Sequence, residues 1–136
     1  MNLLLFRVGS RVLTLPADLI RQVRSLDTLS PLPGSGGALL GLTVVAGRAV
    51  PVLNLRQLVG MPAAEVPARL LLVSLQEQLF CLPVDDVLGF AEDEPPPGSD
   101  LLSPESVIGL PSAGQRGQHL SSDALLAALN RRLTPA

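Results

Sequence analysis

The chain of 136 residues has no lysine, tryptophan or tyrosine, and it has only three phenylalanines, one cysteine and one histidine. All ten basic residues are arginine and the formal net charge is −2, which argues against nucleic acid as a partner. So few aromatic side chains leave almost no material for stacking bases. A phosphate-binding P-loop needs a lysine and is therefore excluded. With a single cysteine, Cys81, no internal disulfide can form, and we expect a reducing compartment, the cytoplasm.

Groups able to perform catalysis are equally scarce. His119 lies far in the sequence from Cys81, so a Cys–His nucleophile pair is not expected. One cysteine and one histidine also give no metal-ligand spacing. The neighbouring Asp85 and Asp86 would point to opposite faces of a strand and so could not share a proton. We therefore predict no enzyme activity, no cofactor and no metal site.

Long hydrophobic runs are missing too. The longest nearly unbroken apolar stretch covers residues 38–46, far short of the roughly 20 residues that a membrane-spanning helix needs. Residues 1–6 have no basic leader and no small-residue cleavage site, which predicts a first strand and not a secretory signal. We expect no direct insertion into a membrane.

The remaining composition favours an all-β fold. Hydrophobic residues make up 47% of the chain, and 12 glycines and 13 prolines divide them into short segments. The central segment predicts a hairpin of Leu42–Val45 and Ala49–Leu53, with Gly47 supplying the positive φ of the turn. Pro51 lies in the second strand, which predicts an edge strand, either protected or used for docking.

Further strands form a repeated pattern. Residues 3–8, 12–15 and 19–23 predict three strands, and residues 69–75, 79–82 and 86–90 predict three more. Placing residues 6–23 over 73–90 aligns turn with turn, and the identical pairs share an offset of 67: Leu15/Leu82, Pro16/Pro83 and Asp18/Asp85. This indicates a duplicated architecture of two similar β units in tandem.

The rest of the chain completes this arrangement. Residues 55–59 predict one helical turn, and the acidic, proline-rich residues 91–104 predict an exposed loop or stiff spacer. Short strands are expected at 106–110 and 118–120. A closing amphipathic helix at 123–133 follows a serine cap and places these leucines on one face: Leu125, Leu126, Leu129 and Leu133.

Charge is distributed unevenly along the sequence. Residues 1–60 hold six arginines against two acidic residues, whereas residues 61–105 hold one arginine against nine. Residues 106–136 hold three arginines against one aspartate. Two interpretations stay open, namely ordinary solvated faces or a bipolar molecule that docks between partners in a fixed orientation.

The central stretch resembles the hallmark of the CheW family, the coupling proteins of bacterial chemosensory arrays. The matching residues are Gly41, Gly47 and Val50-Pro51-Val52-Leu53-Asn54-Leu55-Arg56. Residues 12–23 and Val84-Asp85-Asp86-Val87 resemble two further family segments in the same order, so that the resemblance covers roughly residues 3–130. It implies an all-β fold of two small five-stranded β-barrels in tandem with a C-terminal helix.

The resemblance also implies boundaries and a function. It implies one domain over 1–136, with barrel one near residues 10–60, barrel two near 66–110, and residues 1–9 and 111–136 completing the barrels and the closing helix. Family members are non-catalytic adaptors that bind the regulatory domain of a CheA-type histidine kinase and the cytoplasmic tips of chemoreceptors, in chemotaxis or pilus motility. The alternative from another class is a structural or small-ligand-binding double barrel outside such arrays.

Candidate partner-binding residues follow from this resemblance. The first contact surface comprises Leu42, Val44, Ala46, Gly47, Arg48 and Pro51, and the second-barrel candidates are Val84, Asp85 and Val87. The family usually carries Asn-[LV]-Arg-Gly at the central turn, where this chain has Val44-Val45-Ala46-Gly47. Two polar family positions are therefore apolar here, which predicts an altered partner contact.

Overall fold

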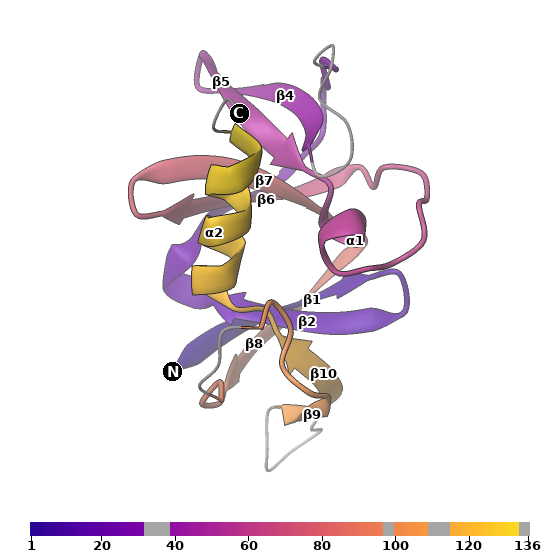
Figure 1. Cartoon of the computed structure of the whole chain (residues 1–136), viewed down its shortest axis with the longest axis vertical. Coiled ribbons are helices and arrows are strands. Elements are labelled where there is room, and N and C mark those ends of the chain that lie inside the picture. The colour runs from indigo at the N-terminus through magenta and orange to yellow at the C-terminus, as the bar shows by residue number, and fades with distance from the viewer. Residues whose placement is uncertain (32–38, 97–99, 109–114, 134–136) are drawn as a thin grey trace. The chain divides into compact units, whose positions relative to one another are not determined.

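The computed structural model describes residues 1–31, 39–96, 100–108 and 115–133, and the account below is confined to them (Figure 1). The described chain forms two five-stranded sheets and a C-terminal helix, which confirms the predicted fold class. It divides into two compact units. Unit 1 contains residues 1–19 and 86–136, and unit 2 contains residues 20–85.

Unit 2 contains a sheet in the order β3-β6-β7-β5-β4. Its core is a cluster of small branched side chains together with the cysteine, lined by Val45, Val50, Val52, Leu70, Leu72 and Cys81. Alternating burial along β4 and β5 puts these valines on one face of the sheet, as expected for half-buried strands. The elements are β3 (Ile20–Ser25), β4 (Leu39–Val45), β5 (Arg48–Leu53), α1 (Leu55–Leu58), β6 (Arg69–Leu75) and β7 (Gln78–Val84).

Unit 1 contains the second sheet, in the order β8-β1-β2-β10-β9. The closing helix begins where Ser121 Oγ accepts a hydrogen bond from the Ala124 N–H, the predicted serine cap. Of the four leucines predicted to share a face of this helix, Leu125 and Leu129 are buried and Leu126 is half-buried, and the side chain of Leu133 lies outside the described residues. The elements are β1 (Asn2–Val8), β2 (Arg11–Pro16), the 3-10 turn η1 (Ala17–Leu19), β8 (Asp86–Glu92), β9 (Ser106–Ile108), β10 (Gln115–His119) and α2 (Ser122–Leu133).

The two sheets repeat one another at the predicted offset of 67. In the β1–β2 hairpin Leu3 pairs with Pro16, and in the β6–β7 hairpin Leu70 pairs with Pro83. The correspondence extends to the helices, because Asn54 caps α1 as Ser121 caps α2. The duplication seen in 18 residues of sequence therefore covers most of the chain.

The order of strands corrects the predicted boundaries at 10–60 and 66–110. The third strand of each repeat pairs with the first strand of the other repeat: β3 with β6, and β8 with β1. Each sheet therefore combines strands from both repeats, and the unit boundaries fall at residues 19–20 and 85–86. The sequence pattern showed the repeat but not this exchange of strands.

The prediction that Pro51 marks an edge strand is wrong, because β5 is an interior strand between β7 and β4. Its parallel pairing with β7 consists of one pair, Val52 with Cys81, whereas the equivalent pairing of β10 with β2 has two pairs. Gln118 takes the place of Pro51 in that longer ladder. Since proline has no N–H to donate, an interior strand accommodates Pro51 by giving up one pair.

Candidate functional site

The β4–β5 hairpin turns within two residues. Val45 pairs with Arg48, and between them Ala46 and Gly47 have φ values of 50° and 79°. Two successive positive φ values define a type I′ turn, whose twist matches that of the flanking strands. Gly47 adopts this conformation without strain, as the sequence predicted, whereas Ala46 does so at a steric cost.

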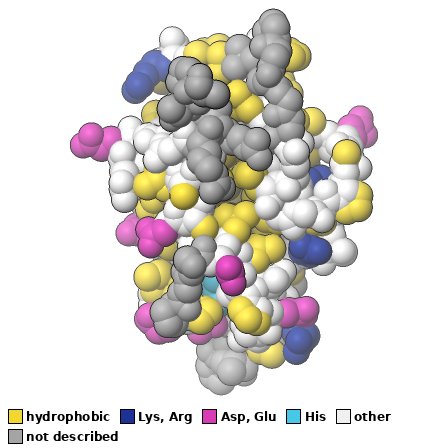
Figure 2. Space-filling view, in the orientation of Figure 1, with side chains coloured by type: hydrophobic (Ala, Val, Ile, Leu, Met, Phe, Trp, Pro, Cys, Tyr) yellow, Lys and Arg dark blue, Asp and Glu magenta, His cyan; other side chains and the backbone are white. Residues whose placement is uncertain are grey.

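The face of this hairpin turned away from the core is apolar. Leu42 pairs with Pro51 and Val44 with Ala49, and these four side chains alternate with the buried valines. Val44 is 58% exposed, a high value for a β-branched apolar residue. We call Leu42, Val44, Ala49 and Pro51 the hairpin outer face. Figure 2 shows that hydrophobic side chains reach the surface at several places on the face in view.

On the side of β4 that does not face β5, the backbone at Ser30 contacts the strand closely. Ser30 and Leu42 exchange two backbone hydrogen bonds, of 2.8 and 2.9 Å. Gly41 has a φ of +155°, and a Cβ at this position would collide with the carbonyl oxygen of Ser30. The glycine of the motif is therefore required by the close approach of the chain at Ser30.

The end of the motif serves a structural purpose. The Asn54 side chain accepts a hydrogen bond from the Gln57 N–H at the start of α1. The Arg56 guanidinium lies 3.5 Å from the Asp85 carboxylate and donates a hydrogen bond of 3.4 Å to the Pro62 carbonyl oxygen. Its buried Nε has no hydrogen-bond partner within the described residues. These contacts link the segment after β5 to the end of β7.

The second group of predicted residues is divided between the two units and differs in burial. Val84 is fully buried at the end of β7, so its side chain packs inside unit 2. Asp85 follows it, with a side chain that is 29% exposed and paired with Arg56. Val87 is partly buried in β8. In the first group, Ala46, Gly47 and Arg48 form the hairpin tip, beside the outer-face residues.

Ala49 is the residue that the sequence analysis missed on this face. The alternation of apolar residues along the strand could have identified it, because side chains two apart share a face. With Ala49 included, the outer face contains no side chain able to act as nucleophile, base or metal ligand.

Titratable groups of interest lie in the interiors of the units. In unit 1, His119 is 5% exposed and its Nδ1 lies 2.7 Å from Thr14 Oγ1. Burial lowers the pKa of His119, and the charge of Asp93 opposes this effect. In unit 2, burial raises the pKa of the Cys81 thiol to about 11, so that this cysteine stays protonated.

Unit 1 also contains a cavity of about 470 Å³, which His119 lines. Its wall includes three serines and three acidic residues: Ser103, Ser121, Ser122, Glu94, Asp100 and Asp123. In the described residues, no group of three or more histidine, cysteine, aspartate or glutamate side chains could hold a metal ion. None of the helices in the described ranges is long and apolar enough to cross a membrane.

Fold and surface together define a small β module with an exposed apolar hairpin face. The chain belongs to the CheW-like domain family, which it matches over residues 2–106. Membership supports a chemotaxis adaptor role. A chemotaxis protein CheW of Rhizobium meliloti (strain 1021) is 26% identical over 107 residues, covering 75% of this chain and 69% of that protein.

A solved structure shares the fold. The scaffolding protein TtCheW from Thermoanaerobacter tengcongensis matches with a TM-score of 0.70 over 88% of each chain. The sequences are 17% identical, so this similarity concerns the fold.

Proposed function

We propose that this chain is a non-catalytic cytoplasmic adaptor that couples chemoreceptors to a CheA-type histidine kinase. Family membership supports this role, and the similar TtCheW is described as a scaffolding protein. The observation that carries the proposal is the hairpin outer face, where Val44 exposes 58% of its surface between apolar neighbours. We assign this face and the hairpin tip as the contact with the regulatory domain of the kinase.

The physical basis of this contact is shape and apolar burial. The outer face offers no charge of its own, and Arg48 at the tip supplies the nearest positive group of the hairpin. Covering Val44 and its neighbours removes apolar surface from water, which favours association. A rigid two-residue turn holds the face in place before binding, which lowers the entropy lost on docking.

The experiment is a calorimetric titration with the regulatory domain of a CheA-type kinase. We expect binding in the micromolar range or tighter, and Val44→Glu to raise Kd at least about tenfold because a charge would be buried without a partner. Val107→Glu is the matched control, since Val107 is also an exposed strand valine, at 42%, and lies on β9. The control should bind like the original protein.

Two results would contradict the proposal. One is the absence of binding at high protein concentration, and the other is an equal loss of affinity in both valine variants. Circular dichroism of each variant would establish that its sheets are intact. A parallel titration with the cytoplasmic tip of a chemoreceptor tests the second partner.

The alternative function, a small-ligand-binding double barrel, has one specific observation in its favour. The cavity in unit 1 has room for a small molecule and carries hydroxyl and carboxylate groups. Copurification separates the two functions, because an adaptor forms a stoichiometric complex with the kinase domain and a ligand-binding barrel does not.

A further inference from the structure

Strand β3 is one edge of the unit 2 sheet and β8 is one edge of the unit 1 sheet, with β4 and β9 at the opposite edges. β3 pairs with β6 and β8 pairs with β1, and in the described part of the chain neither has a strand on its other side. Edge strands offer backbone groups to another strand, and proteins usually protect them. Each edge strand here has one bulge near its start and regular pairing afterwards. In each strand, four residues with regular pairing remain, namely 22–25 in β3 and 89–92 in β8.

Exposed apolar side chains lie on both edges at equivalent positions. Val23 on β3 is 44% exposed, and Phe90 on β8 is 69% exposed. The two residues are related by the internal offset of 67, and Leu88 beside Phe90 is 38% exposed. A phenylalanine with most of its surface in water is a characteristic feature of an interaction site.

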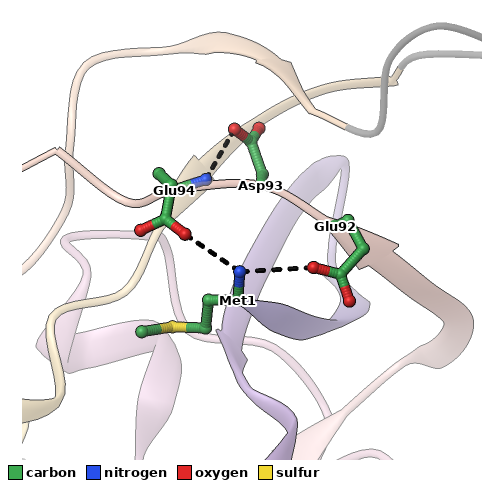
Figure 3. A network of polar contacts seen from close by, with 4 residues as sticks. All are labelled: Met1, Glu92, Asp93 and Glu94. Carbon is green, nitrogen blue, oxygen red and sulfur yellow. Dashed lines mark hydrogen bonds and ion pairs between the residues drawn. The ribbon is translucent and has the colours of Figure 1, made fainter.

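The two edges carry opposite charges. β3 contains Arg21 and Arg24 and no acidic residue, whereas residues 86–94 contain four acidic residues and no basic one. Figure 3 shows Glu92 and Glu94 on either side of the Met1 amino group, at 3.2 and 3.0 Å. These side chains are 75% and 81% exposed, so such ion pairs contribute little and leave the carboxylates accessible.

The duplication allows a register in which the two edges fit. In an antiparallel pair, facing residues must both direct their N–H and C=O groups toward the partner strand or both away from it. Val23 faces Leu71, and Phe90 faces Leu4, which is the equivalent of Leu71. Val23 and Phe90 therefore have the same orientation, and a register with Val23 opposite Phe90 satisfies the ladder. It also brings Arg21, the bulge residue just before the regular segment of β3, to the end of the contact at which Glu92 lies.

We propose that this protein self-associates head to tail, with β3 of one copy pairing antiparallel with β8 of a second copy. Val23 packs against Phe90, and Arg21 forms an ion pair with Glu92. Because each copy presents both edges, association continues from copy to copy. This contact uses neither the hairpin outer face nor the kinase, so its failure would leave the proposed kinase contact untouched.

The first test is sedimentation of the full chain over a concentration series. We expect reversible association that weakens with added salt, because the charges at its rim are screened. Val23→Glu places a carboxylate opposite the acidic edge and Phe90→Glu removes the aromatic contact. Each should weaken self-association at least about tenfold. Val44→Glu, on the hairpin outer face, is the control that should leave it unchanged.

A mixing experiment identifies the pairing. Val23→Glu leaves β8 intact and Phe90→Glu leaves β3 intact, so each variant alone should be monomeric at concentrations where the original protein associates. An equimolar mixture should form a one-to-one dimer and nothing larger, because a single pair of compatible edges remains. Arg21→Glu should weaken association of the full chain, and adding Glu92→Arg to the same chain should restore it.

The proposal is overturned by any of three results. The original protein stays monomeric at millimolar concentration, the equimolar mixture stays monomeric, or Val23→Glu alone still dimerises, which indicates β8 pairing with β8. Circular dichroism and thermal unfolding of each variant show that the loss of association is not a loss of fold.

Discussion

Gly41 shows how much one residue of the motif contributes to the fold. Gly41→Ala is expected to lower the free energy of unfolding by about 3 kcal/mol, because the methyl group meets the Ser30 carbonyl and φ is +155°. Gly60→Ala is the control, since Gly60 also has a positive φ but nothing within 4 Å. There we expect about 1 kcal/mol. Urea unfolding measures both, and equal losses would contradict the role of the Ser30 contact.

At the same scale, the Thr14–His119 pair predicts a dependence of stability on pH. Burial lowers the pKa of His119 in the folded protein below its unfolded value of about 6.5. The unfolded chain therefore binds the proton more readily, and stability falls as pH drops below about 6.5, until the folded state also takes up the proton. Above that pH this contribution is complete. Urea unfolding between pH 5 and 8 measures it.

The other repeat supplies the matched variant. Val52 and Cys81 occupy the positions equivalent to His119 and Thr14, so Thr14→Cys with His119→Val copies an existing apolar pair. The double variant should lose the histidine-linked change with pH and keep its stability at neutral pH, because both polar partners are removed together. His119→Val alone leaves the Thr14 hydroxyl without its partner and should cost about 1–3 kcal/mol. An unchanged pH profile in the double variant would contradict this account.

At the scale of the element, the two-residue turn of the β4–β5 hairpin contains a residue that strains it. Ala46 has a φ of 50° at the first turn position, where asparagine is favoured. Ala46→Asn should raise the free energy of unfolding by about 0.5–1 kcal/mol. Ala64→Asn, on the exposed segment after α1, should change nothing. Denaturant midpoints compare the two, and no gain at residue 46 would contradict the strain assigned to the turn.

The elements also show what local sequence patterns determine. The β4–β5 hairpin and the strands of the β1–β2 and β6–β7 hairpins were predicted, because short turns separate their apolar runs. Val23 of β3 pairs with Leu71, 48 residues away, and Phe90 of β8 pairs with Leu4, 86 residues away, and no local signal specifies either partner. Pro51 was assigned to an edge for the same reason, since the rule on proline considers one strand and not its neighbours.

Similar limits apply to the candidate site. The outer face of the hairpin could be inferred from alternation, and Val44 and Pro51 lie on it as partly or largely exposed residues. Val84 could not be placed from sequence, because a valine before two aspartates is compatible with either a strand end or a turn. The structure extends β7 to Val84 and buries it.

At the scale of the whole molecule, the exchange of strands changes the distribution of charge. By sequence segment, residues 61–105 are strongly acidic, with one arginine against nine acidic residues. By structural unit, unit 2 holds five arginines against four acidic residues, and unit 1 holds five against eight. The contrast between the units is smaller than the contrast along the sequence, so opposite charge is better described at the level of the two edge strands.

The exchange of strands also sets an order of assembly on the ribosome. All five strands of unit 2 lie within residues 20–85, so its sheet can be completed as soon as that stretch emerges. The β1–β2 hairpin emerges earlier, but β8 and β10, which flank it, are synthesised later. Its apolar strands therefore remain without their neighbours for most of translation. Strands β1 and β2 are made before the strands of unit 2 but complete their sheet after them, and during that interval the nascent chain is exposed to aggregation and to chaperones.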